Sequence, residues 1–331
     1  MRKLFLIFNT ILFALLLSGC GSAAVGNTVI SGFYFDTVVN VTIYGDMAVS
    51  PEEAERRIRE KLEEEELVFS PTKEEAVLAA FNASGEELLK DAELCETLMR
   101  AEEFYELSGG AADPTIGSVS ILWDFHGGEN MPDEALIEEG LRHCGMKDVL
   151  EFTGEGYVRR KDKDTVIDLG FIAKGRIADE LKVMMTEELG VSSAVINLGG
   201  NVTLIGCKPG GKPFKVGIQK PFAEGENICV IGAEDTSVVT SGVYQRCFEK
   251  DGKLYHHILD PATGYPAESG LQAVTVVCED AAAADALSTA CMVMGKDKGM
   301  ELIGAYPGAE ALFIDDKGQQ YVTEGFPERT I

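Results

Sequence analysis

The segment from Ala284 to Ala290 constrains this chain more than any other part of the sequence. It follows a run of alanines, and alanine has the highest helix propensity, so the segment predicts a helix. Positions i and i+4 of a helix share one face, which would bring Asp285 and Thr289 together. A carboxylate and a hydroxyl are hard oxygen ligands of the kind Mg²⁺ prefers. Taken alone, the pair is explained more simply by an Asp in the first helical turn and a Thr bonded to its own helix, so the metal interpretation depends on other segments.

The N-terminus has the features of an export signal. A basic start precedes an apolar run over residues 4–17 that is too short for a stable membrane span. The run ends in Leu-Ser-Gly-Cys, which resembles the bacterial lipobox, with Cys20 as the lipidated new N-terminus. We therefore expect a signal peptide over 1–19, a lipid-anchored tether over 20–30 and an extracytoplasmic, membrane-anchored lipoprotein. An uncleaved anchor and an ordinary signal peptide are the alternatives.

Charge and cysteine content narrow the classes of function. The net charge of −26 argues against nucleic acid or anionic lipid as a partner of the bulk surface. It also means that a phosphate-bearing ligand needs local compensation from a cation, a lysine or backbone amides. None of the eight cysteines forms a C-x-x-C, so neither a zinc site nor a redox motif is indicated. Seven of them follow Cys20, and this odd number leaves one or two disulfides open.

Strand and helix patterns are mixed along the chain without strict alternation, which predicts an α+β fold of mixed or antiparallel sheets with packed helices. Neither G-x-G-x-x-G after a strand nor a P-loop occurs. The expected helices cover residues 51–66, 86–107, 132–145 and 173–188 and the segment of Asp285. The expected strands are 34–44, 165–169, 194–198, 215–219, 228–232, 237–240, 271–278, 309–314 and 320–322.

Four loops beside these elements collect residues that can carry chemistry. They span 109–117, 168–175, 240–246 and 255–266. In the second loop a strand delivers Asp168, and Lys174 enters the next helix, where a lysine and free amides suit a phosphate. A helix-capping Asp and a solvated Lys explain the same residues at least as simply. In the fourth loop, His256 or His257 could act as a general base, or could be satisfied by backbone groups.

Together, these loops and the Asp285 segment resemble the FAD:protein FMN transferase (ApbE) family, whose members include many lipoproteins. The resemblance runs from Phe33 to Val322. It is carried, in order, by D-L-G-x-I-A-K-G, I-N-L-G-G, S-G-x-Y-x-R, H-x-L-D-P-x-T-G-x-P and A-D-A-L-S-T-A. It implies an ApbE-like, T-fold-like domain over 31–331.

The resemblance implies a Mg²⁺-dependent transferase. The family cleaves FAD, attaches FMN through a phosphoester to a Thr or Ser of an acceptor protein, and releases AMP. Known acceptors are flavin-bearing subunits of Rnf-type and Nqr-type redox pumps. An FAD pyrophosphatase and a non-catalytic flavin-binding lipoprotein are the alternatives.

The resemblance also assigns site residues. The metal ligands would be Asp285, Thr289 and the backbone carbonyl of Phe171, and His257 would be the base that activates the acceptor hydroxyl. The expected FAD contacts are Phe35, Ala111, Ala112, Asp113, Asp168, Lys174 and Leu259.

Three positions depart from the family pattern. Phe171 stands where a small residue is usual, although the ligand there is its carbonyl. Ala112 and Thr72 stand where aromatic residues are usual. We expect weaker stacking on the flavin, by about 1 kcal/mol for each lost ring contact.

Overall fold

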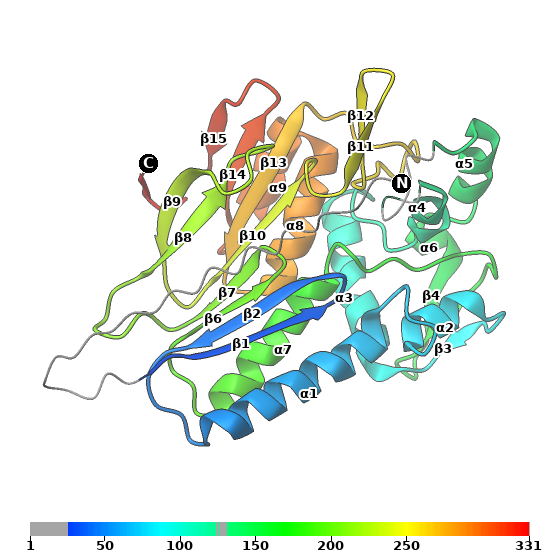
Figure 1. The fold of residues 1–331 in the computed structure, drawn as a ribbon. Helices are drawn as coiled ribbons and strands as arrows, with labels where there is room; N and C mark the ends of the chain where they lie inside the picture. Colours follow the sequence, from blue (N-terminus) through cyan, green and yellow to red (C-terminus); the bar gives the residue numbers. More distant parts are fainter. Residues whose placement is uncertain (1–25, 124, 126–130, 331) are drawn as a thin grey trace, which may run out of the picture.

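The computed structural model describes residues 26–123, 125 and 131–330. Its centre is an eight-stranded antiparallel sheet with the order β1-β2-β6-β7-β10-β13-β14-β15 (Figure 1). The strands are β1 (Thr28–Tyr34), β2 (Thr37–Ile43), β6 (Ala194–Leu198), β7 (Asn201–Ile205), β10 (Ser237–Gly242), β13 (Leu271–Cys278), β14 (Glu310–Asp315) and β15 (Gln320–Val322). Strand β1 starts at Thr28, inside the range expected to be a tether.

The sheet is covered on both faces. Along β14, Ala311 and Phe313 face a core shared with helices, whereas Leu312 and Ile314 face a second core shared with a smaller sheet. This alternation follows from the two-residue repeat of a strand. The helices on the first face are α1 (Pro51–Phe69), α3 (Ala92–Leu107), α7 (Ala173–Glu187), α8 (Ala281–Met294) and α9 (Lys296–Ala305). The smaller sheet contains β8 (Phe214–Gln219), β9 (Asn227–Ala233) and β16 (Arg329–Thr330).

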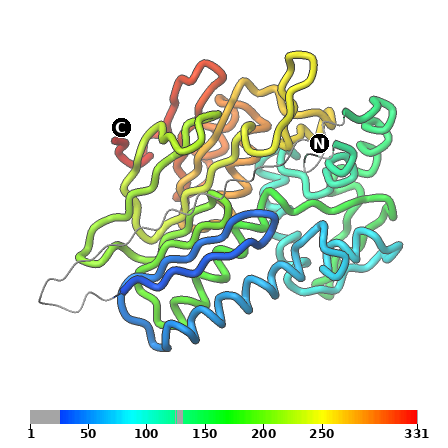
Figure 2. The backbone as a smooth tube through the Cα atoms, viewed as in Figure 1, coloured from blue at the N-terminus to red at the C-terminus, as the bar shows by residue number. Residues whose placement is uncertain are grey.

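The remaining elements gather at one end of the molecule, where Figure 2 shows the cyan and blue-green part of the chain. They are α2 (Val77–Ala83), β3 (Leu88–Leu89), α4 (Gly117–Trp123), α5 (Glu134–Leu141), α6 (Met146–Val149), β4 (Leu150–Phe152) and β5 (Val158–Arg160). A separate hairpin of β11 (Cys247–Lys250) and β12 (Lys253–His256) projects nearby. Within the described residues no helix is long and apolar enough to cross a bilayer.

The predicted α+β class with antiparallel sheets is confirmed, but residues 34–44 are not a single strand. They contain the end of β1, the two-residue turn Phe35–Asp36 and β2. Both turn residues have positive φ, of 54° and 56°. Such hairpin turns usually carry Asn or Gly, so Phe-Asp gave no turn signal in the sequence.

The strand predicted over 165–169 is also absent, because this segment is extended but forms no ladder with another strand. Two of its amides bond to side chains instead of to another strand: the Val166 amide donates to Ser118 Oγ at 2.9 Å and the Ile167 amide to Asn82 Oδ1 at 2.9 Å. The pattern of apolar residues could not distinguish these two ways of satisfying an extended backbone.

Other differences concern helix ends and cysteines. The helix predicted over 86–107 begins only at Ala92, because Asp91 caps it by accepting the Leu94 amide at 3.0 Å. The helix predicted over 132–145 is the shorter α5. The seven cysteines after Cys20 are all free.

Helices α7 and α8 pack unusually closely, and Gly175 permits it. A Cβ at Gly175 would lie 2.2 Å from the Ala281 carbonyl oxygen and 2.6 Å from the Ala282 Cα. The same contact is reinforced by Asp179 of α7, whose carboxylate accepts the Ala281 and Ala282 amides at 3.0 and 2.9 Å. These first-turn amides of α8 would otherwise lack partners. The contact between the helices therefore fixes the N-terminus of α8.

We predict that Gly175→Ala destabilises the protein by about 1–3 kcal/mol, because the added methyl group meets backbone atoms that cannot move aside easily. Urea unfolding measures this loss. Gly304→Ala in α9 is the control, since a Cβ there meets nothing within 4 Å and should leave stability unchanged or slightly raised. Equal stability of the two variants would contradict the close-packing argument.

We predict a pH-dependent contribution from Asp179. Burial raises the pKa of its carboxyl from 3.8 to about 6. Between these values the folded protein retains a proton that the unfolded chain has lost, so this group's contribution to stability falls as the pH rises from 4 to 6 and is constant above. The difference in unfolding free energy between the parent and Asp179→Asn should follow that course, by at most about 1.4 kcal/mol per pH unit. A difference independent of pH would contradict it.

Candidate functional site

Asp285 lies at the contact between α7 and α8. Its Oδ2 accepts the Gly175 amide at 3.0 Å and lies 3.6 Å from Lys174 Nζ. The side chain is 3% exposed. Lys174 also donates to the Gly170 carbonyl oxygen at 3.2 Å. The structure therefore brings the second loop, which includes Phe171, directly against the carboxylate of the Asp285 segment.

Thr289 lies one turn after Asp285 on α8, as the i, i+4 spacing predicts. Its Oγ1 lies 3.1 Å from the Ser241 hydroxyl, which also contacts the Ser288 hydroxyl at 2.8 Å. Ser241 belongs to the third loop, over residues 240–246, and its residue type alone did not indicate this role of its hydroxyl. The signal that could have found it is its position at the end of β10, beside α8.

Asp168 connects the second loop to the first. Its Oδ1 accepts the Gly170 amide at 2.9 Å and its Oδ2 accepts the Ser120 hydroxyl at 2.9 Å. The Asp168 amide donates to the Pro114 carbonyl oxygen at 2.7 Å. Nothing in the sequence pattern pointed to Ser120, because its role depends on how α4 folds against the loop.

The first loop is fixed by a buried carboxylate. Asp113 is 4% exposed and accepts the amides of Thr115 and Gly145 at 2.9 and 3.0 Å. Burial raises the pKa of Asp113, and these hydrogen bonds oppose the rise. Ala112 is buried and its amide donates to Ser108 Oγ at 3.0 Å. The Asp113 carboxylate thus holds its own turn, and the assignment of Ala111, Ala112 and Asp113 to FAD remains a prediction.

The two histidines of the fourth loop differ in their surroundings. His256 is 6% exposed and its Nε2 lies 3.2 Å from the Ala267 carbonyl oxygen. His257 is half-buried, its amide donates to the Arg246 carbonyl oxygen at 3.1 Å, and within the described residues its enclosed Nδ1 has no hydrogen-bond partner. Burial, with help from the positive charge of Arg246, holds the pKa of His257 well below that of a solvated imidazole. The ring is therefore unprotonated at pH 7, and its lowered pKa makes it a weaker base than a solvated imidazole.

Aromatic packing holds the rest of the fourth loop. Trp123 of α4 donates from Nε1 to the Gly264 carbonyl oxygen at 2.9 Å and stacks on Tyr255 with ring centroids 5.7 Å apart. Leu259 is buried in the same cluster. Asp260 closes the turn, because its Oδ1 accepts the Ala262 amide at 2.9 Å. The predicted FAD contact at Leu259 is thus placed by α4.

Phe35 occupies the tip of the β1–β2 hairpin. Its left-handed backbone is rare for a bulky residue, and such strain is often found at functional positions. The Phe35 amide donates to Glu66 Oε1 at 2.8 Å, and Glu66 also forms an ion pair with Lys73. Thr72, beside Lys73, is exposed. The position of Phe35 is fixed by α1 and the segment that follows it.

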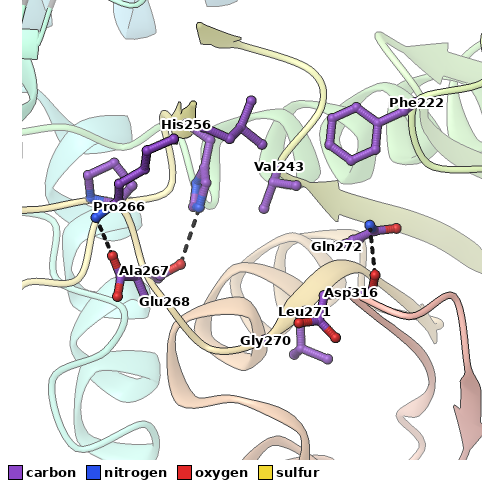
Figure 3. Close-up of a pocket in the computed structure, with 12 residues that line it drawn as sticks. Phe222, Val243, His256, Pro266, Ala267, Glu268, Gly270, Leu271, Gln272 and Asp316 are labelled. Atoms are coloured by element: carbon purple, nitrogen blue, oxygen red, sulfur yellow. Dashed lines mark hydrogen bonds and ion pairs between the residues drawn. The ribbon is translucent and has the colours of Figure 1, made fainter. Parts of the chain in front are cut away.

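A cavity of about 220 Å³ lies beside His256 (Figure 3). None of the predicted FAD or metal residues lines it, so it is distinct from the site built around Asp285. The lining residues are Phe222, Val243, Lys253, Leu254, His256, Pro266, Ala267, Glu268, Gly270, Leu271, Gln272 and Asp316.

A second cluster has the composition of a metal site. Ligand atoms of His143, Asp162 and Asp164 lie within 4.8 Å of one another. They already have partners, because His143 Nδ1 bonds to Asp162 at 2.6 Å and Asp164 pairs with Lys163 at 2.7 Å. The hard oxygens of Asp285 and Thr289, without a nitrogen ligand, fit Mg²⁺ better than this cluster does.

The chain is similar to known proteins over most of its length. The ApbE family profile matches residues 35–313. The chain is 35% identical over 285 residues to the FAD:protein FMN transferase of Treponema pallidum, covering 81% of this chain and 78% of that protein. It is 30% identical to the FAD:protein FMN transferase of Escherichia coli K12, covering 91% and 88%.

Solved structures show the same relationship. The fold is similar to that of the ApbE protein of Thermotoga maritima, with a TM-score of 0.80, 35% identity and coverage of 90% of this chain and 97% of that one. It is also similar to the flavin transferase ApbE of Vibrio cholerae, with a TM-score of 0.81, 27% identity and coverage of 91% and 98%. The resemblance of the sequence motifs is thus confirmed, and the chain belongs to the ApbE family.

Proposed function

We propose that this protein is a Mg²⁺-dependent FAD:protein FMN transferase. It would join FMN to a Thr or Ser hydroxyl of an acceptor protein through a phosphoester and release AMP. The observation that carries the proposal is the junction at which the Asp285 carboxylate meets Lys174 and the Gly175 amide. The names of the matched relatives support the transfer of FMN from FAD to a protein.

The residues present suit a magnesium ion. Asp285 and Thr289 offer a carboxylate and a hydroxyl from one helix face, and the Phe171 carbonyl belongs to the loop packed against Asp285. When bound there, Mg²⁺ would offset the charge of the pyrophosphate and stabilise the leaving AMP. The chain's own contribution is to hold these oxygens still, because α7, α8 and the second loop are tied together at Gly175.

Phosphate binding requires local positive charge in a protein whose net charge is −26. Lys174 supplies it at the start of α7, where the helix N-terminus adds the partial positive charge of its amides. Its ammonium group lies 3.6 Å from Asp285, near enough to serve the same ligand.

His257 would act as the general base. An unprotonated ring nitrogen takes the proton of the acceptor hydroxyl, whose oxygen bonds to the phosphorus of the FMN half. The bond from that phosphorus to the bridging oxygen breaks, and AMP leaves with that oxygen. The lowered pKa of His257 keeps the ring unprotonated before transfer and also reduces its basicity, so the proposed role depends on the position of the ring beside the acceptor hydroxyl.

The proposal also covers the acceptor protein and the place of the enzyme in the cell. Flavin-bearing subunits of Rnf-type or Nqr-type pumps are the acceptor class we propose. We further propose that Cys20, which lies outside the described residues, carries the lipid that anchors the enzyme on the extracytoplasmic side. Loss of membrane association in Cys20→Ala would support this anchoring.

We predict that the protein, FAD, Mg²⁺ and an acceptor domain together give a mass gain of one FMN on the acceptor and one AMP for each transfer. Mass spectrometry and nucleotide analysis measure both products. AMP without a labelled acceptor would indicate a pyrophosphatase instead. Bound FAD with no AMP would indicate a non-catalytic flavin carrier.

We predict that Asp285→Asn lowers the Mg²⁺-dependent rate at least about a hundredfold, because the amide keeps the shape but removes the charge at the metal. Initial rates across a Mg²⁺ titration measure it. Asp297→Asn is the matched control, since that side chain is 87% exposed at the start of α9. A rate for Asp285→Asn equal to that of the control would show that the metal assignment is wrong.

We predict that His257→Ala binds FAD as the parent does but transfers FMN about 10²–10⁴-fold more slowly, because only the proton acceptor is removed. His143→Ala is the control, since its ring pairs with Asp162 outside the site. Flavin fluorescence gives the affinity and acceptor labelling gives the rate. Parental transfer by His257→Ala would remove His257 from the mechanism.

A further inference from the structure

The segment that carries Asp168 and Phe171 has an unusual backbone partner, the side chain of Asn82. The Ile167 amide donates to Asn82 Oδ1 at 2.9 Å, and Asn82 Nδ2 donates to the Ile167 carbonyl oxygen at 2.8 Å. One side chain thus satisfies both backbone groups of the residue before Asp168, as a neighbouring strand would.

A buried arginine contacts the residues on either side of Asn82 and so holds Asn82 in place. Arg160 is 1% exposed, and it donates to the carbonyl oxygens of Ser84 and Glu86, each at 2.8 Å, just after α2. Its guanidinium carbon lies 4.4 Å from the centre of the Phe81 ring, next to Asn82. These contacts fix both sides of Asn82 in the chain.

Arg160 also contacts the segment that carries Asp168 and Phe171, at its first residue. Its Nη1 donates to the Thr165 carbonyl oxygen at 3.1 Å. Within the described residues it forms no ion pair with a carboxylate, although its burial is costly and lowers its pKa. A rigid fork of donors suits three carbonyl groups from separate segments, which a lysine could not bind together.

We propose that Asn82 is a positioning residue, which fixes the Ile167 peptide and thereby the Asp168 carboxylate and the Phe171 carbonyl, with Arg160 holding Asn82 and the start of the segment. This inference rests on the proposed function, in which Asp168 and Phe171 serve FAD and Mg²⁺. The inference adds Asn82 and Arg160 to the residues that matter for the site, and neither of them is proposed to contact the substrate. Errors of about 1 Å at reacting groups can cost a hundredfold in rate, so a segment without strand neighbours needs such a clamp.

The test uses Asn82→Asp, which keeps the size and the acceptor oxygen but replaces the donor with a charged oxygen facing the Ile167 carbonyl. The control is Ile231→Val, which removes one methyl group from the buried core between the two sheets, away from the segment. Because this control is also destabilised, it separates a positioning effect from a general loss of stability.

The first readout is amide hydrogen exchange, which requires no ligand. Asn82→Asp should speed exchange over residues 165–171 by about fivefold or more relative to both the parent and Ile231→Val. Unchanged exchange in a folded Asn82→Asp would overturn the clamp itself.

The second readout is FAD binding in the presence of Mg²⁺, measured by calorimetry well below the unfolding temperature of each variant. Asn82→Asp should raise the Kd for FAD about tenfold or more, whereas Ile231→Val should leave it unchanged. Faster exchange with unchanged FAD affinity would overturn the positioning role. If the parent binds FAD without transferring FMN, the proposed function fails while the clamp stands. If the parent binds no FAD, the positioning role fails with the function.

Discussion

The hydrogen bond from the Gly175 amide to Asp285 is the contact on which the rest of the site depends. It exists because Gly175 has no side chain to keep α7 from α8. The same approach lets Asp179 cap the amides at the start of α8. A single close helix contact therefore sets the depth of Asp285, the direction of α8 and, one turn later, the position of Thr289.

In the proposed function, a strongly acidic protein has to bind a pyrophosphate. Lys174 and the start of α7 supply positive charge beside Asp285, together with the proposed metal, whereas acidic residues outnumber basic ones over the whole chain. Within this arrangement the carboxylates have different tasks. Asp285 accepts one backbone amide and lies beside Lys174, whereas Asp113 and Asp179 each accept at least two backbone amides. Burial alone would not separate these classes, but their hydrogen-bond partners do.

The sequence predicted the parts of the site that depend on local periodicity. The spacing of Asp285 and Thr289, the placement of Lys174 at a helix start and the antiparallel α+β class all follow from residues close together in the chain. The two strand predictions that were wrong, over 34–44 and 165–169, concern segments that are held by side chains from distant parts of the chain. The extended segment 165–169 is paired by Asn82 and Ser118, and the Phe35–Asp36 turn is held by Glu66. Contacts across 31 to 85 residues leave no local pattern to detect.

In the proposed function, one cation binds between α8 and the second loop, which spans residues 168–175. The most direct measurement is a crystal structure of the protein grown with FAD and Mn²⁺, in which anomalous scattering locates the metal. We expect a peak about 2.0–2.3 Å from oxygens of Asp285 and Thr289, in contact with the pyrophosphate. A peak at His143, Asp162 and Asp164 instead, or FAD bound away from Asp285, would contradict it.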